Sequence, residues 1–214
     1  MAAAGEQFIV MVEGWCMTQS ADTVQAWLQR YPRMAKLIDP NLSDAVLDQI
    51  LEGLLDESIR KLEDSANLYS TLNEEQLTGI LKFILERDGL RVDCETNVNG
   101  HVDLRIEVDM SLSTRRRLAE AKCWRGPKYH AGGIAQLLGY MTGRESSGYV
   151  IGYVQERNIA QKWADLQAHL DKELPANQEA ACQLGTSTWT LEARHRHSSG
   201  VSLRIVHYGV NLGR

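Results

Sequence analysis

The sequence lacks the features of a secreted, disulfide-bonded or membrane-spanning protein. Its four cysteines, Cys16, Cys94, Cys123 and Cys182, are scattered and form no CxxC pair. This spacing argues against a disulfide framework or a zinc site and favours free thiols in a reducing cytosol. No apolar run approaches the roughly 20 residues that cross a bilayer, and the N-terminus lacks the basic segment of a secretory signal. Together with the lack of internal repeats, these absences predict a cytoplasmic globular protein without membrane association.

Composition and charge describe an ordinary globular protein with one unusual local patch. The 214 residues are 43% hydrophobic and 24% charged, which suits one domain with an appendage or two small domains. Residues 1–70 hold 11 acidic and 5 basic residues and carry −6, whereas residues 71–214 hold 17 acidic and 18 basic residues and carry +1. Residues 111–130 contain six bases against one acid. Such a basic patch is either a solvated surface run or a nucleic-acid contact.

The first 70 residues have the pattern of a helical module. Leucines and isoleucines recur at helical spacing through residues 43–64, which predicts the longest helix of the chain. Shorter helices are expected over residues 23–31 and 6–17. No catalytic pattern falls in this part of the chain. We therefore expect residues 1–70 to form an accessory module that docks a partner.

From residue 71 the pattern changes to that of an α/β domain. Asn73 is a suitable N-cap for a helix that ends near Asp88-Gly89. The apolar period then becomes two, and an Asn99-Gly100 turn is expected between the first two strands. The remaining predicted elements are strands over 90–98, 101–110 and 116–124, a helix over 129–142, a strand over 148–155, a helix over 159–173, and strands near 187–193 and 201–208. This order predicts a mixed central sheet flanked by helices in a domain over residues 71–214.

The stretch LAEAKCW, residues 118–124, raises the question of why a strand would carry opposite charges on one face. Alternation puts four side chains on that face: Leu118, Glu120, Lys122 and Trp124. A Glu–Lys pair two residues apart on a strand is commonly a surface ion pair worth under ~1 kcal/mol. The preceding strand, however, carries Asp103, and a hairpin-like connection can set Asp103 beside Glu120.

Asp103, Glu120 and Lys122 together suit phosphodiester hydrolysis. Two neighbouring carboxylates repel each other unless a divalent cation lies between them. Their oxygens suit Mg²⁺ or Mn²⁺, which polarises a phosphate oxygen and lowers the pKa of a bound water. The ammonium of Lys122 can orient that water or offset charge that builds on the phosphate. We therefore treat these three residues as candidate catalytic residues.

The segments GHVDL and EAKCW resemble the PD-(D/E)xK nuclease superfamily, in which an acid on one strand precedes E-x-K on the next. The following helix contains QLLGY, which matches the Q-x-x-x-Y motif of the RecB-type branch and puts Gln136 and Tyr140 on one helical face. The resemblance covers residues 71–160 and departs from the superfamily pattern at His101-Val102, where the superfamily name has a proline. It implies a restriction-endonuclease-like α/β fold.

The resemblance also implies an activity and a set of site residues. The activity is that of a Mg²⁺- or Mn²⁺-dependent deoxyribonuclease. Asp103, Glu120 and the backbone carbonyl of Ala121 would bind the metal, and Lys122 would be the catalytic lysine.

Further roles follow for residues around this centre. Gln136 and Tyr140 would support the site or contact DNA, and Glu75 is the candidate for an additional ligand from the leading helix. Trp124 and Tyr129 are core residues or surfaces for a splayed base. The candidate DNA contacts on the basic patch are Arg115, Arg116, Arg117, Arg125 and Lys128.

The resemblance also bears on partners and alternatives. Nucleases of this superfamily often form one part of a restriction, repair or anti-phage defence system, so residues 1–70 are expected to dock a protein such as an ATPase. Homo-oligomerisation, DNA versus RNA, and endo- versus exonuclease activity stay open. The cysteines lack the closely spaced C-terminal group of an iron–sulfur cluster, so none is expected. The alternatives are a non-catalytic nuclease-fold subunit that binds nucleic acid or assembles a partner complex, and a chance match in an unrelated α/β protein.

Overall fold

A computed structural model of the chain describes residues 7–12, 15–30, 32–37, 39, 41–87, 89–97, 101–108 and 115–213. The helices are α1 Ala21–Arg30, α2 Pro32–Leu37, α3 Asp44–Asp64, α4 Ala66–Tyr69, α5 Glu74–Leu85, α6 Pro127–Tyr140 and α7 Ile159–Glu173. The strands are β1 Gln7–Val12, β2 Trp15–Ser20, β3 Leu90–Asn97, β4 His101–Val108, β5 Arg115–Cys123, β6 Ser147–Val154, β7 Gln183–Leu184, β8 Thr190–Arg196 and β9 Ser202–Asn211.

A mixed sheet of seven strands forms the centre of the molecule, in the order β3-β4-β5-β6-β9-β8-β7. Strands β3, β4 and β5 are antiparallel, and β5, β6 and β9 are parallel. Because a parallel pair needs a crossover connection, α6 links β5 to β6. The predicted α/β class with a mixed sheet flanked by helices is confirmed.

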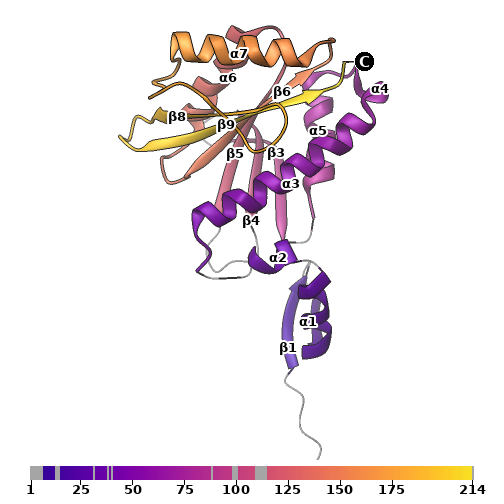
Figure 1. Cartoon of the computed structure of the whole chain (residues 1–214). Helices are drawn as coiled ribbons and strands as arrows, with labels where there is room; N and C mark the ends of the chain where they lie inside the picture. The colour runs from indigo at the N-terminus through magenta and orange to yellow at the C-terminus, as the bar shows by residue number, and fades with distance from the viewer. Residues whose placement is uncertain are drawn as a thin grey trace, which may run out of the picture.

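Helices cover both faces of this sheet (Figure 1). The core on one face combines leucines of α3 and α5, such as Leu51 and Leu77, with Ala119 and Ala121 of β5. The core on the other face combines α6 and α7 with Leu118 of β5 and with apolar residues of β4, β6, β8 and β9. Strand β5 is therefore buried on both sides, so any polar group on it must find a partner within the protein.

Local sequence signals account for most of the helix and strand positions. Asn73 and Gln76 form a reciprocal capping box at the start of α5, with Asn73 Oδ1 accepting from the Gln76 N–H at 2.9 Å. Helix α7 covers the predicted residues 159–173 without an offset. In β4 the residues Val102 to Val108 alternate between buried and half-exposed, as the period of two predicts. The expected Asn99-Gly100 turn and Met110 lie outside the described residues.

The helix expected over residues 6–17 is wrong. Strands β1 and β2 occupy this segment and pair antiparallel, with Gln7 opposite Ser20 and Val12 opposite Trp15. The run FIVMV is short and continuously apolar, and such runs fit a strand as well as a helix. Its β-branched residues favour the strand. The prediction also missed α2, α4 and β7 and placed β8 three residues early.

Helix α3 belongs to the core of the sheet domain. Its buried leucines share one hydrophobic cluster with α5 and with the strands, so the core continues across the boundary expected at residue 70. In Figure 1, α3 lies across the sheet, whereas β1 and α1 lie apart from it. The partner-docking role of residues 1–70 stays a prediction. None of the helices within the described residues is long and apolar enough to cross a membrane.

Candidate active site

The predicted site residues meet where β4 and β5 stop pairing. The last pair of this ladder is Leu104 with Ala119. Beyond it, the N–H of Ala121 donates to Oδ2 of Asp103 at 2.8 Å, so a side chain takes the place of a backbone acceptor. Glu120 follows Ala119 on β5 as Asp103 precedes Leu104 on β4, which puts the two carboxylates at corresponding positions on one face. The expected meeting of Asp103 with the E-x-K strand is therefore seen.

The ammonium of Lys122 lies among three carboxylates. Its Nζ is 2.6 Å from Oε1 of Glu120, 3.7 Å from Oε1 of Glu74 and 4.0 Å from Oδ2 of Asp103. Glu120 and Lys122 are only 2% and 9% exposed. Oε2 of Glu120 is buried and has no hydrogen-bond partner within the described part of the chain. The cluster thus consists of three carboxylates around the Lys122 ammonium, and Oε2 of Glu120 accepts no hydrogen bond from the described residues.

The acid that α5 contributes is Glu74 and not the predicted Glu75. Oε2 of Glu74 accepts a hydrogen bond from the N–H of Cys123 at 2.6 Å, while Oε1 faces Lys122. Glu75 is exposed and lines a cavity beside the cluster. Consecutive residues on a helix point about 100° apart, so only one of two neighbours faces the strand. The sequence signal was present, since both acids lie in the first turn after Asn73, but only packing distinguishes them.

Burial and neighbouring charges shift the pKa values of Glu120 and Lys122. Burial raises the pKa of Glu120 to about 7; the hydrogen bond from Lys122 opposes this rise, and the charge of Asp103 adds to it. Burial lowers the pKa of Lys122, but the three carboxylates outweigh burial and raise it above its usual value. Lys122 therefore stays cationic near neutral pH. It can donate hydrogen bonds and balance negative charge, but it is a poor base.

Helix α6 closes over this face of β5 and brings Tyr140 near. The helix packs closely at Gly133, where a Cβ would make a tight contact of 3.3 Å with Cγ1 of Val150 and ordinary contacts with Glu120 and Lys122. The pKa of Tyr140 is raised by burial and then by the charges of Glu120 and Asp103, so its phenol lies within their electrostatic range. Gln136, one turn earlier, is exposed. Of the two residues of the QLLGY motif, the structure brings Tyr140 to the site and leaves Gln136 at the surface.

The three consecutive arginines do not form a rim of this site. The prediction is wrong for Arg117, which is 2% exposed and bonded to Asp48 at 2.7 Å and Asp44 at 3.0 Å. Arg116 pairs with Glu145 at 2.8 Å. These residues begin β5, and five residues of strand, roughly 17 Å, separate Arg117 from Lys122. A local count of basic residues cannot show that helix α3 brings acids to meet them.

Arg115 is held in the same region, at the start of α3. It donates to the backbone carbonyl of Leu42 and lies 4.0 Å from a carboxylate oxygen of Asp44. The other two predicted DNA contacts, Arg125 and Lys128, are exposed. Of these two, Arg125 lines the cavity beside the carboxylate cluster.

A cavity of about 890 Å³ opens next to the cluster. Acids from two elements line it, Glu74 on α5 and Asp103 on β4. The segment that follows β5 also lines it, with Trp124, Arg125 and Tyr129. A ligand in this cavity could therefore contact both carboxylates and a basic, aromatic segment.

The donor set suits a hard divalent cation that keeps part of its water shell. A strand residue directs its own N–H and C=O to the same side, so the Ala121 carbonyl points with its N–H toward Asp103. The Asp103 carboxylate, the Ala121 carbonyl and Oε2 of Glu120 are the ligand types that Mg²⁺ or Mn²⁺ takes. Among the residues that the structure describes, no group of three or more His, Cys, Asp and Glu side chains is arranged to hold a metal ion. Water would therefore have to complete the coordination.

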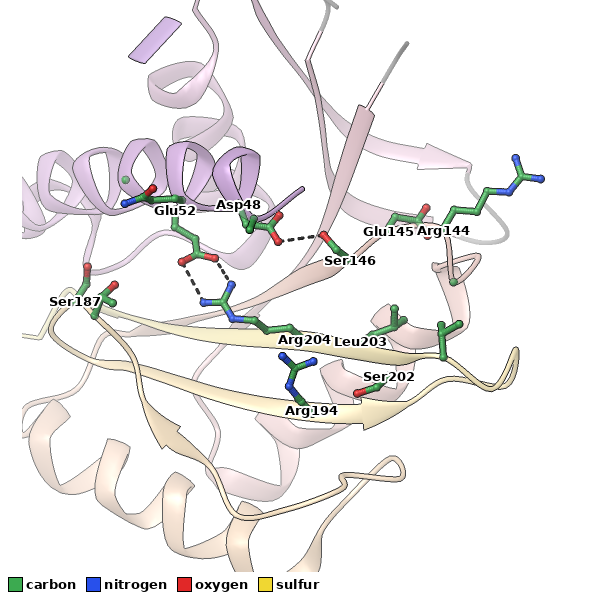
Figure 2. Close-up of a pocket in the computed structure, with 16 residues that line it drawn as sticks. Asp48, Glu52, Arg144, Glu145, Ser146, Ser187, Arg194, Ser202, Leu203 and Arg204 are labelled. Carbon is green, nitrogen blue, oxygen red and sulfur yellow. Dashed lines mark hydrogen bonds and ion pairs between the residues drawn. The ribbon is translucent and has the colours of Figure 1, made fainter. Parts of the chain in front are cut away.

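A second cavity lies at the opposite end of the sheet, between α3 and strands β8 and β9 (Figure 2). Its acids are engaged in ion pairs: Glu52 bonds both terminal nitrogens of Arg204, and Asp48 accepts from Ser146 at 3.0 Å. These contacts attach α3 to β9 and to the start of β6. The second cavity thus contains the polar contacts that hold the helix on the sheet.

Comparison with known proteins adds no relative. No protein-family model matches the chain, and no curated protein or solved structure matches it either.

Proposed function

We propose that the chain is a metal-dependent nuclease that hydrolyses phosphodiester bonds of DNA. One observation carries the proposal: the carboxylates of Asp103 and Glu120, from two strands, lie within 4.0 Å of the Lys122 ammonium beside a cavity. The order α5-β3-β4-β5-α6-β6 supports it, since three antiparallel strands followed by a helix and a parallel strand suit the restriction-endonuclease-like fold that the sequence resembles.

Each residue has a distinct role in this proposal. Asp103, Glu120 and the Ala121 carbonyl would hold Mg²⁺ or Mn²⁺, which would polarise the scissile phosphate and acidify a water. Lys122 donates hydrogen bonds to a phosphate oxygen or to the attacking water, and its positive charge is worth most where negative charge develops. Glu74 holds the Cys123 N–H and so fixes the strand end that carries Lys122. The packing of α6 over Glu120 excludes bulk water from this face.

The test is cleavage of linear and circular DNA by the purified chain with Mg²⁺, Mn²⁺ or EDTA. Cleavage is expected with a metal and not with EDTA, and circular DNA distinguishes an endonuclease from an exonuclease. The matched control is Lys122→Ala, which should fold and should lack activity. Folding is expected to survive because Glu120, with its pKa near 7, can take up a proton when its partner is removed. Metal-independent cleavage, or full activity in Lys122→Ala at equal thermal stability, contradicts the assignment.

A non-catalytic nuclease-fold subunit is the second candidate. The short contact between Lys122 and Glu120, 2.6 Å, favours it, because a strand buried on both faces needs its charges paired whether or not it has a catalytic role. In that case both the wild-type protein and Lys122→Ala would bind nucleic acid and neither would cleave it.

A further inference from the structure

An exposed aromatic residue and a cation lie together at the mouth of the active-site cavity. The guanidinium carbon of Arg125 is 5.1 Å from the ring centroid of Tyr129, a cation–π arrangement. The Tyr129 side chain is 38% exposed, and Arg125 is exposed as well. Both line the cavity that Asp103 and Glu74 also line. The pair therefore faces the space that a substrate would occupy.

Trp124, the other aromatic residue of this segment, lines the same cavity but is half-buried and packs against the core. Its ring lies 6.0 Å from that of Trp163 and 6.1 Å from that of His130. The backbone N–H of Trp124 donates to the carbonyl of Tyr153 at 2.8 Å, which attaches the residue to β6. The structure thus distinguishes two aromatic residues that the sequence left equivalent: both line the cavity, but Trp124 is half-buried against the core, whereas Tyr129 is exposed.

The physical chemistry of the pair points to an unpaired nucleotide. An aromatic ring offers a stacking surface to any base, and a neighbouring guanidinium offers a contact to the phosphate beside that base. In a duplex, the faces of the bases are already covered by their neighbours, so a protein ring gains a base only where the strand is single or frayed. We propose that Arg125 and Tyr129 form a platform on which one base of single-stranded DNA stacks, with the adjoining phosphate held by Arg125.

This inference rests on the proposed nuclease function, but it can be measured without cleavage. The experiment is fluorescence anisotropy in EDTA with the full chain and three labelled probes: a dT12 single strand, a blunt DNA duplex closed by G·C pairs at both ends and a U12 single strand. The variants are Tyr129→Ala, Tyr129→Phe and Arg125→Ala. Phe83→Ala is the matched control, since Phe83 is 81% exposed and lines a different cavity on α5.

We expect Tyr129→Ala to weaken dT12 binding by about 5- to 150-fold, the loss that accompanies one stacked base. The closed duplex should bind equally to wild type and variant, and Tyr129→Phe should bind dT12 within about twofold of wild type because it keeps the ring. Arg125→Ala should lower the salt dependence of dT12 binding by about 0.7 in the logarithmic slope, which corresponds to one phosphate contact on a single strand. The control Phe83→Ala should change neither quantity.

Three results overturn the platform. They are failure of the wild type to bind dT12, equal dT12 affinity in wild type and Tyr129→Ala, and equal losses for dT12 and the closed duplex. A Tyr129 effect seen with U12 alone also overturns the choice of DNA. The nuclease proposal is tested separately: metal-dependent cleavage without a Tyr129 effect leaves it intact, while a Tyr129 effect without cleavage supports the platform on a non-catalytic subunit.

Discussion

Replacing Asp48 by alanine should destabilise the protein strongly, because it breaks a buried ion pair that holds α3 on the sheet. Nε of Arg117 donates to Oδ1 of Asp48 at 2.7 Å, and the guanidinium is 2% exposed. Ser147 also donates to Oδ1 of Asp48, at 2.9 Å. Burial lowers the pKa of Arg117, but the charge of Asp48 and the hydrogen bonds to Asp48 and Asp44 outweigh burial and raise it above its usual value. Because an arginine guanidinium keeps its proton in proteins, Arg117 stays charged when Asp48 is removed.

The magnitude follows from what the substitution leaves behind. Removing one member of a buried ion pair costs roughly 3–5 kcal/mol, because the other charge stays desolvated. Asp44 still accepts from Arg117 at 3.0 Å, but it is half-exposed, so we take the lower end, about 3 kcal/mol. For a protein of this size each kcal/mol shifts Tm by roughly 2–4 °C. The expected fall in Tm is about 6–12 °C.

Thermal and urea unfolding of three variants measure this effect. Asp56→Ala is the control on the same helix, since Asp56 pairs with the exposed Arg60 at 2.7 Å and such a pair is worth only about 0.3–0.5 kcal/mol. The double variant Asp48→Ala/Arg117→Met removes the stranded charge and should recover a large part of the lost stability. If Asp48→Ala loses no more than Asp56→Ala, or if the double variant is as unstable as Asp48→Ala, the ion pair does not hold α3 on the sheet.

Three further outcomes are expected. Lys122→Arg should lose roughly 10²-fold or more in cleavage rate, because a planar guanidinium does not replace a compact ammonium; near-normal rates would exclude a specific role for the ammonium. Mg²⁺ affinity measured by calorimetry should rise by up to about tenfold per pH unit until about pH 7 and then level off, since protons compete for Glu120 below its pKa; a flat profile would place the ion elsewhere. Burial lowers the pKa of His130 to about 3 and that of His207 well below 6.5, so both are neutral in the fold and their stabilising effect is complete above about pH 6.5 and lost as pH falls. At pH 5 the lowered pKa of His130 should reduce the free energy of unfolding in urea by about 2 kcal/mol, and NMR titration of the His130 imidazole between pH 7 and 5 would contradict this.

The candidate site was predictable from the sequence as far as strand order reaches. Asp103 on one strand and Glu120 with Lys122 on the next are matters of period-two alternation, and the structure brings the three together. The contribution of Glu74 in place of Glu75 was not predictable, since both acids satisfy the same helix-start signal. The choice depends on the rotation of α5 against β5, which the contacts of the whole core set.

The basic patch shows the same limit more plainly. Counting charges over residues 111–130 treats Arg117 and Arg125 as equivalent. In the structure, one is buried against Asp48, which lies 69 residues away in the sequence, and the other is exposed beside the active-site cavity. The partner of a charge is a long-range property that no local window contains.

By itself, the sequence determined the helices and strands of residues 73–211, except the short β7, to within a few residues. It also determined the mixed α/β class and the strand face on which Glu120 and Lys122 lie. These follow from apolar periodicity and capping, which are local. Only the tertiary structure decided that α3 joins the core, that Arg117 is buried while Arg125 is exposed, and that Glu74 is the acid of α5 that reaches the site. Those outcomes depend on which elements pack together, because burial and charge pairing are fixed by contacts between residues far apart in the chain.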